Sequence, residues 1–125
     1  MGKSYKPKML GGEIQKVVSD MLIRGDLKDP GFKGMIGVTG VDVTNDGSYA
    51  TLFLTAMSMD GKDFSQEDKD GILAAFNKSK GFIRTEIGKR VKVRHTPELI
   101  FKFDTSFEYG VKMDKILDQI KKEEA

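Results

Sequence analysis

A third of the basic side chains of this sequence fall within a short stretch, residues 78 to 95. One acidic residue, Glu86, lies among them, so the stretch carries a formal charge of +6 while the rest of the chain carries −4. This separation of positive from negative charge along the chain is expected of a protein with a surface that binds a polyanion such as RNA. The basic residues concerned are Lys78, Lys80, Arg84, Lys89, Arg90, Lys92 and Arg94.

A glycine-containing turn, Ser79-Lys80-Gly81, interrupts a helical pattern inside this basic stretch. Two helices that meet at such a turn can hold nucleic acid, because glycine lets the backbone approach a phosphate and the second helix offers its positive end. Lys80 adds charge at the turn, and Arg84 follows one helical turn later. The alternative is a charged helix face that only keeps the protein soluble, with Ser79 and Gly81 serving as a helix C-cap.

Catalytic signatures are missing from the sequence. It has no cysteine and a single histidine, His95, which excludes disulfides, thiolate nucleophiles and histidine-rich metal clusters. Phosphate-binding loops, hydrolase elbows, zinc-protease motifs and dinucleotide glycine patterns are also absent. Acidic pairs such as Asp60 and Asp63 are interpreted as solubilising and capping groups, although a carboxylate site for magnesium or calcium stays open. We expect no enzymatic activity, no cofactor and no metal.

A first helix is predicted over residues 8–24, where apolar side chains recur at three- and four-residue steps. Gly11 and Gly12 fall in its first turn, and each costs about 1 kcal/mol relative to alanine. That turn therefore either frays or makes a close contact. The apolar residues are Leu10, Ile14, Val17, Val18, Met21 and Leu22.

Three strands are predicted. The first runs over residues 36–43 with a β-bulge near Gly40, and a turn at residues 44–47 joins it to a second strand over residues 49–57 as an antiparallel hairpin. Pro97 bars a helix, and residues 99–103 alternate as the third strand.

Three further helical segments are predicted around the turn and after the third strand. Ser65 caps a helix whose buried face includes Ile72 and Phe76, and after the turn Phe82, Ile83 and Ile87 resume the apolar pattern in a different phase. An apolar stripe predicts a last helix over residues 107–122, with the first basic residues and the final Lys-Lys-Glu-Glu-Ala frayed.

The order helix, strand, strand, helix, kink, helix, strand, helix predicts a single α+β domain over residues 1–125. Three strands and helices with matching apolar faces fit a two-layer sandwich, in which the helices cover one side of a mainly antiparallel sheet. No stretch reaches the length of a membrane span, and the start lacks the apolar region of a secretory signal. We expect a cytoplasmic protein with no membrane partner.

A series of short motifs follows the predicted elements in order along nearly the whole chain, and the run Thr96-Pro97-Glu98-Leu99-Ile100-Phe101 is the most specific of them. The other segments, in order, are the first helix, Leu27-Lys28-Asp29-Pro30, Val41-Asp42-Val43-Thr44, Tyr49-Ala50, the kink, Asp104, Glu108-Tyr109-Gly110 and Ile116-Leu117. In the joint order and spacing of these motifs the chain resembles the ribosome-binding factor A family.

The resemblance implies a KH-like fold of the second topological type, in which an A-x-G kink replaces the usual G-x-x-G loop. Ser79 stands where the family usually has alanine, a change between small residues that should keep the kink. By the resemblance, the RNA-facing surface would comprise Lys78, Ser79, Lys80, Gly81, Arg84, Lys89, Arg90, Lys92 and Arg94, with Lys3, Lys6 and Lys8 as secondary candidates.

The implied function is non-catalytic. Members of the family bind the immature small (30S) ribosomal subunit and its 16S rRNA, favour processing of the 5′ end of that rRNA, support growth in the cold, and work with a maturation GTPase. We expect the same of this chain, as a monomer. Two rival hypotheses are a stand-alone KH-like protein that binds messenger or small regulatory RNA, and a small α+β enzyme that uses carboxylates and a metal.

Overall fold

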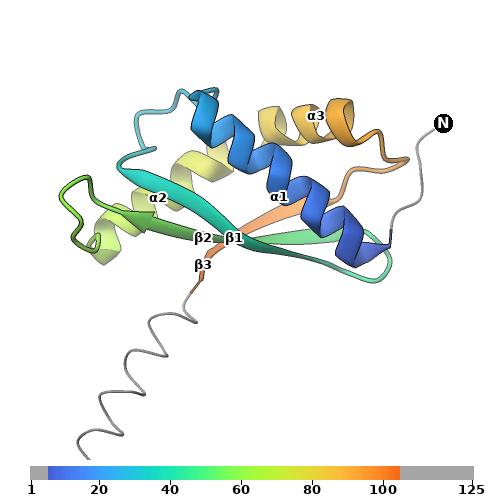
Figure 1. Ribbon diagram of the computed structural model, residues 1–125, viewed down its shortest axis with the longest axis horizontal. Coiled ribbons are helices and arrows are strands. Elements are labelled where there is room, and N and C mark those ends of the chain that lie inside the picture. Colours follow the sequence, from blue (N-terminus) through green and yellow to red (C-terminus); the bar gives the residue numbers. More distant parts are fainter. Residues whose placement is uncertain (1–5, 105–125) are drawn as a thin grey trace, which may run out of the picture.

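Three helices lie on one side of a three-stranded sheet in the part of the chain that the computed structural model describes, residues 6–104 (Figure 1). The order confirms the α+β prediction as far as the third strand. The predicted helix over residues 107–122 lies outside the described residues. The elements are α1 (Pro7–Arg24), β1 (Met35–Val43), β2 (Tyr49–Met57), α2 (Gln66–Lys78), α3 (Lys80–Val91) and β3 (Glu98–Phe103).

Strands β1 and β2 form the predicted antiparallel hairpin, with Met35 opposite Met57 and Val43 opposite Ala50. The register shifts between Val38 and Gly40, which confirms the predicted β-bulge. In the connecting turn Gly47 adopts a φ of 75°, a backbone conformation that glycine reaches without steric cost.

Strand β3 runs parallel to β2, from Glu98 opposite Tyr49 to Phe103 opposite Leu54. The sheet is therefore mixed, and the prediction of a mainly antiparallel sheet needs this correction. The physical reason is the connection: α2 and α3 lie between β2 and β3, and such a long crossover returns the chain to the end of the sheet where β2 begins.

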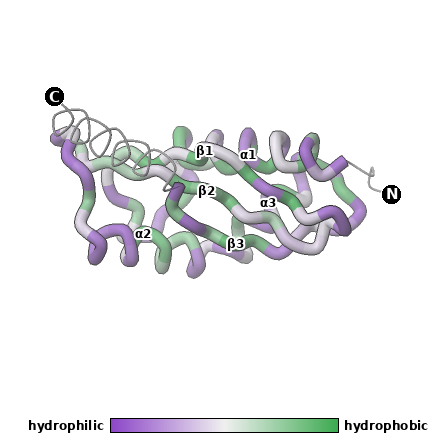
Figure 2. Tube along the Cα trace, turned by 90° about the horizontal axis from the view of Figure 1, so that it is seen from below, coloured by the Kyte–Doolittle hydropathy of each residue, from purple (hydrophilic) through white to green (hydrophobic). Residues whose placement is uncertain are grey.

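The core lies between the helices and one face of the sheet. Phe76 of α2 is fully buried at its centre, 4.8 Å from the Phe32 ring in an edge-on arrangement and 5.0 Å from the Phe101 ring. Figure 2, turned by 90° from the view of Figure 1, shows the molecule from below, with the sheet in front of α1 and α3. The other buried apolar residues of this cluster are Leu10, Ile14, Val17, Val18, Met21, Leu27, Val38, Ala50, Leu52, Leu54, Ile72, Ile83, Ile87, Val91, Leu99 and Phe101.

Helix α1 lies directly against β1 at Gly11. This glycine is buried, and a Cβ atom built on it would be 2.5 Å from the carbonyl oxygen of Val41. Of the two alternatives for the first turn of this helix, fraying or a close contact, the structure supports the close contact. Helix α1 begins at Pro7, whose fixed φ suits the first position of a helix. Within residues 6–104, no helix is long and apolar enough to cross a membrane.

Candidate nucleic-acid interface

The break between α2 and α3 occurs at Ser79, as the sequence predicts. Its backbone has φ −91° and ψ 2°, and its amide donates to the carbonyl oxygens of Ala75 (3.0 Å) and Phe76 (3.1 Å). The Ser79 carbonyl in turn accepts from the amide of Ile83 at 2.9 Å. Because the Ser79 side chain forms no capping bond to α3, its hydroxyl is left for another partner.

Gly81 lies in the first turn of α3. Neither its backbone conformation nor the space around it requires a glycine at this position. Its φ is not in the left-handed region, and a Cβ atom built on it would meet nothing within 4 Å. A glycine inside a helix costs about 1 kcal/mol relative to alanine. The absent side chain therefore leaves the surface beside the kink open to the close approach of another molecule.

Arg84 ties α3 to the segment that leads into β3. Its Nε donates to the carbonyl oxygen of Pro97 at 3.1 Å, and its Nη2 donates to that of Thr96 at 2.9 Å. Its Nη1 lies 3.4 Å from Oε1 of Glu98. Since Arg84 makes three internal contacts and its side chain is one-third exposed, its first role in this fold is to position α3.

Arg90 ties α3 to α1 and to the segment after it. Its Nη1 lies 2.6 Å from Asp20, its Nε donates to Glu86 at 3.1 Å, and its Nη2 lies 3.9 Å from Asp26. The hydrogen bond from Arg90 holds the pKa of the Asp20 carboxyl below its usual value, with a second contribution from Arg24. The same bond to Asp20 raises the pKa of Arg90. The positive charge of Arg90 is thus largely compensated within the protein.

Two neighbouring residues provide a test of this assignment. Arg90→Gln should lower the melting temperature at neutral pH, whereas Lys89→Gln should leave it unchanged, because Lys89 is exposed and makes no ion pair within residues 6–104. Since Asp20 has a lowered pKa in the folded protein, its contribution is present above its usual pKa of 3.8 and is lost as the pH falls through the lowered value. Thermal unfolding by circular dichroism at pH 7 and pH 3 should show the difference between wild type and Arg90→Gln shrinking at pH 3. An unchanged difference at pH 3 would refute the ion-pair assignment.

Five cations of the predicted surface make no ion pair or side-chain hydrogen bond within residues 6–104. We call them the free cations, and the term refers to these residues alone. Because no internal partner holds their charge, they are the part of the predicted set that is available to bind phosphate. They are Lys78, Lys80, Lys89, Lys92 and Arg94.

The free cations do not all point the same way. Lys80 and Lys89 are nine residues apart, which is two and a half helical turns, so they lie on opposite sides of α3. Lys80 is half-buried beside the kink, whereas Lys89 is exposed on the outer side. Lys92 ends the helix with a φ of 60°. Of the secondary candidates, Lys6 and Lys8 are exposed at the start of α1, and Lys3 lies outside the described residues.

Phe82 departs from the prediction. The sequence pattern grouped it with Ile83 and Ile87 as part of a buried face, but its side chain is 52% exposed while both isoleucines are fully buried. The stripe of Ile83, Ile87 and Val91 has a four-residue step, and Phe82 lies more than a quarter of a turn away from it. This off-stripe phase was the signal in the sequence that could have identified Phe82 as a surface residue.

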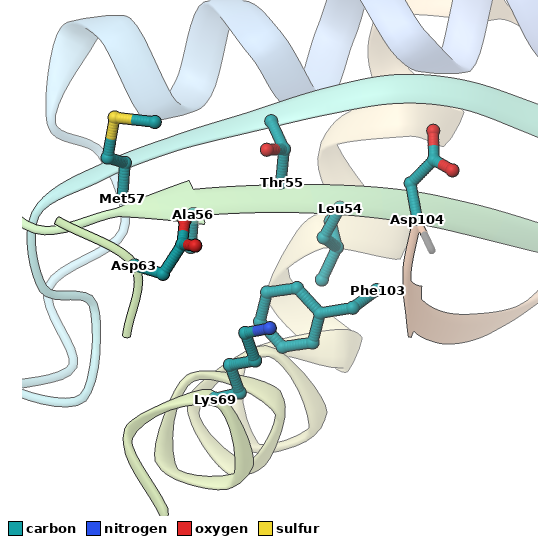
Figure 3. A pocket seen from close by; sticks show the side chains of 8 residues that line it. All are labelled: Leu54, Thr55, Ala56, Met57, Asp63, Lys69, Phe103 and Asp104. Atoms are coloured by element: carbon teal, nitrogen blue, oxygen red, sulfur yellow. The ribbon is translucent and has the colours of Figure 1, made fainter. Parts of the chain in front are cut away.

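A separate pocket of about 260 Å³ lies where β2 and β3 end, and Figure 3 shows the side chains that line it. Lys69 places its Nζ 5.8 Å from the centre of the Phe103 ring on one wall, and Asp63 lies across from them. The residues lining the pocket include none of the predicted RNA-facing set.

The acidic residues provide no metal site in the described part of the chain. In residues 6–104 no three acidic, histidine or cysteine side chains lie close enough together to hold a metal ion. Asp60, one of the acidic residues considered in the sequence, lies in a local turn, where hydrogen bonds from the amide of Lys62 and the hydroxyl of Ser58 lower the pKa of its carboxyl.

Comparisons with known proteins agree on one family. Residues 6–117 match the family model described as Ribosome-binding factor A. A ribosome-binding factor A from Desulforamulus reducens is 44% identical over 122 residues, covering 98% of this chain and 95% of that protein. The crystal structure of ribosome-binding factor A from Thermus thermophilus has the same fold, with a TM-score of 0.60 at 23% identity over 78% of this chain and 96% of that one.

A second structural neighbour carries information about an assembly. It is a Thermus thermophilus ribosome-binding factor A homology model that was fitted into a cryo-EM map of a 30S complex of that factor. Its TM-score is 0.61 at 19% identity, and the match covers 79% of this chain and 96% of that one. At this identity the likeness supports the fold, and the 30S complex is a property of the Thermus protein.

Proposed function

The chain belongs to the ribosome-binding factor A family, and on that premise we propose that it binds the small (30S) ribosomal subunit through its 16S rRNA and assists late maturation of that subunit. The observation that carries the proposal is the set of free cations, of which Lys78 and Lys80 flank the kink and Lys89, Lys92 and Arg94 lie at the other end of α3. Basic side chains that have no internal carboxylate partner can neutralise phosphates, and the release of counterions from the RNA then drives binding. The Thermus relative was fitted into a 30S complex, and the rRNA of a 30S subunit supplies the phosphates that such cations bind.

In this proposal the predicted surface divides into two roles. Ser79, Gly81 and the two flanking lysines contact rRNA at the kink, whereas Lys89, Lys92 and Arg94 contact it at the C-terminal end of α3. Arg84 and Arg90 hold α3 in place against the segment that leads into β3 and against α1, so they position the binding surface without contacting RNA themselves. Substitution of a free cation should therefore weaken RNA binding, whereas substitution of Arg84 or Arg90 should lower the stability of the fold.

The proposed action requires no bond to be broken. A protein that binds one arrangement of immature rRNA more tightly than the others stabilises that arrangement in proportion to the difference in affinity. Such selection would favour processing of the 5′ end of 16S rRNA by other enzymes. It would matter most in the cold, where alternative RNA structures exchange slowly. A maturation GTPase as functional partner, a cytoplasmic location and a monomeric state complete the proposal.

Gly81 offers the test with least disturbance to the fold. Gly81→Ala should keep or slightly raise stability, because alanine favours the helix and a Cβ atom meets nothing within 4 Å. It should weaken binding to purified small subunits by roughly tenfold, since the methyl group would hold a phosphate away from the α3 amides and cost a charge-assisted hydrogen bond. Co-sedimentation with purified small subunits measures the affinity.

Gly71→Ala is the matched control. Gly71 is also an exposed helical glycine whose added Cβ would meet nothing within 4 Å, but it lies in α2 away from the kink. Its replacement should leave the affinity unchanged. Equal affinity of the Gly81 and Gly71 variants would contradict a close phosphate contact at the kink, and a wild-type protein that fails to co-sediment would contradict the proposed function itself.

A further inference from the structure

Phe82 is the most exposed aromatic side chain among residues 6–104, at 52%, followed by Tyr49 at 50%. The structure gives it no ring-to-ring or cation–π contact within those residues. A large apolar side chain in this position leaves its ring in water next to one of the most positively charged segments of the chain. Its role is therefore not explained by the packing of the described core.

The neighbours of Phe82 on the outer side of α3 are polar or small. Thr85 and Lys89 follow at three and seven residues, so they lie on the same side of the helix as Phe82. The Thr85 hydroxyl donates to the Gly81 carbonyl at 2.9 Å, which turns it toward the helix backbone. Glu86, four residues after Phe82, also lies on this side, but it is paired with Arg90 and only 22% exposed. Phe82 and Lys89 are the long side chains on this side without an internal partner among residues 6–104, about 10 Å apart along the helix axis.

The charges around Phe82 favour one kind of ligand. Glu86, the acidic residue one turn after Phe82, is engaged by the Nε of Arg90 at 3.1 Å, so its charge is compensated. Lys89 is uncompensated within residues 6–104, and Gly81 beside Phe82 presents no side chain. An open aromatic face next to free positive charge suits an RNA base, because a base stacks on the ring while its phosphate reaches the cation.

We propose that Phe82 stacks on an unpaired base of the ribosomal RNA while Lys89 contacts a phosphate of the same strand. This inference rests on the proposed function and adds to it a specific contact. Paired bases in an RNA helix are already stacked and leave no free face, so the contact selects a single-stranded loop, bulge or end. The outer side of α3 thereby recognises an unpaired RNA segment by its bases as well as by the charge of its phosphates.

A substitution series separates stacking from other apolar contact. Phe82→Trp should bind small subunits at least as tightly as wild type, whereas Phe82→Leu and Phe82→Ala should each bind about ten- to a hundredfold more weakly. All three should remain folded by circular dichroism, because Phe82 is about half exposed and does not belong to the buried cluster. Ile23→Ala, at an 85% exposed position on α1, is the matched control and should change nothing. Wild-type affinity of Phe82→Leu would overturn the inference and point to an apolar contact with a ribosomal protein.

A spectroscopic readout reports the stack directly. The sequence contains no tryptophan, so Phe82→Trp labelled with 7-azatryptophan carries a single probe that can be excited apart from ribosomal tryptophan. Small subunits should quench its fluorescence, and they should leave an Ile23→Trp probe unchanged. If Phe82→Trp binds without quenching, the inference fails while the proposed function stands. If the wild-type protein does not bind small subunits, the proposed function fails and the inference fails with it.

Discussion

Joint replacement of Lys78, Lys80, Lys89 and Lys92 by glutamate should lower the affinity for small ribosomal subunits by about a hundredfold or more near physiological salt. The reason is that each lysine contributes a phosphate contact, and each glutamate adds repulsion from the RNA. The fold should survive, since none of the four has an ion pair within residues 6–104 to lose. Co-sedimentation gives the affinity, and circular dichroism confirms the fold.

The control must make the same change in net charge. Four exposed lysines that lie outside α2, α3 and the segment after α3 serve for this: Lys16, Lys28, Lys62 and Lys102. Their joint replacement by glutamate should reduce the affinity far less, because only long-range repulsion changes and salt screens it beyond about 10 Å. Equal losses in the two variants would mean that net charge, and not the free cations, determines binding.

Arg84 and Arg90 are left out of this variant for a structural reason. Both lie in the same basic stretch and would be natural targets from the sequence alone. Their guanidinium groups hold the segment before β3 and the Asp20 carboxylate, so glutamate at either position would place like charges together and break internal contacts. Loss of binding in such a variant would report loss of structure.

Gly11→Ala should lower the free energy of unfolding by about 2–3 kcal/mol. The added Cβ atom would lie 2.5 Å from the Val41 carbonyl oxygen, and since that oxygen belongs to the β1 backbone, α1 must move away from the sheet. Core contacts of α1 are then lost together. The corresponding fall in melting temperature should be roughly 10 °C or more for a domain of this size. Denaturant unfolding measures the free energy.

The neighbouring glycine provides the opposite result. A Cβ atom on Gly12 would meet nothing within 4 Å, so Gly12→Ala should raise the free energy of unfolding by about 0.5–1 kcal/mol through helix propensity. The two substitutions add the same methyl group to adjacent positions of one helix. Similar effects from both would show that α1 does not lie against β1 as closely as the structure has it.

Local signals account for the parts of the fold that could be predicted from sequence. The bulge at Gly40 interrupts a two-residue alternation, and Ser65 precedes acidic residues at the start of α2, where its side chain accepts from the amide of Asp68. The kink at Ser79 separates two apolar stripes of different phase. Each feature is encoded within a few residues, which is why a single sequence suffices to find it.

The features that the sequence did not reveal depend on distant residues. The direction of β3 is set by the path of α2 and α3 over the sheet, and the alternation of β3 itself is the same in either direction. The role of Arg90 depends on Asp20, seventy residues earlier in the chain. A count of charges along a segment cannot distinguish a cation held by internal carboxylates from one open to a ligand, so the predicted site contained both kinds.

The central claim, that the free cations contact rRNA phosphates, is tested most directly by the salt dependence of binding to purified small subunits. The affinity of the wild-type protein should fall steeply as the logarithm of the salt concentration rises. Replacing Lys78, Lys80, Lys89 and Lys92 with glutamine should reduce the steepness by about three units, close to 0.7–0.9 for each phosphate contact removed. An unchanged slope in this variant would contradict the account.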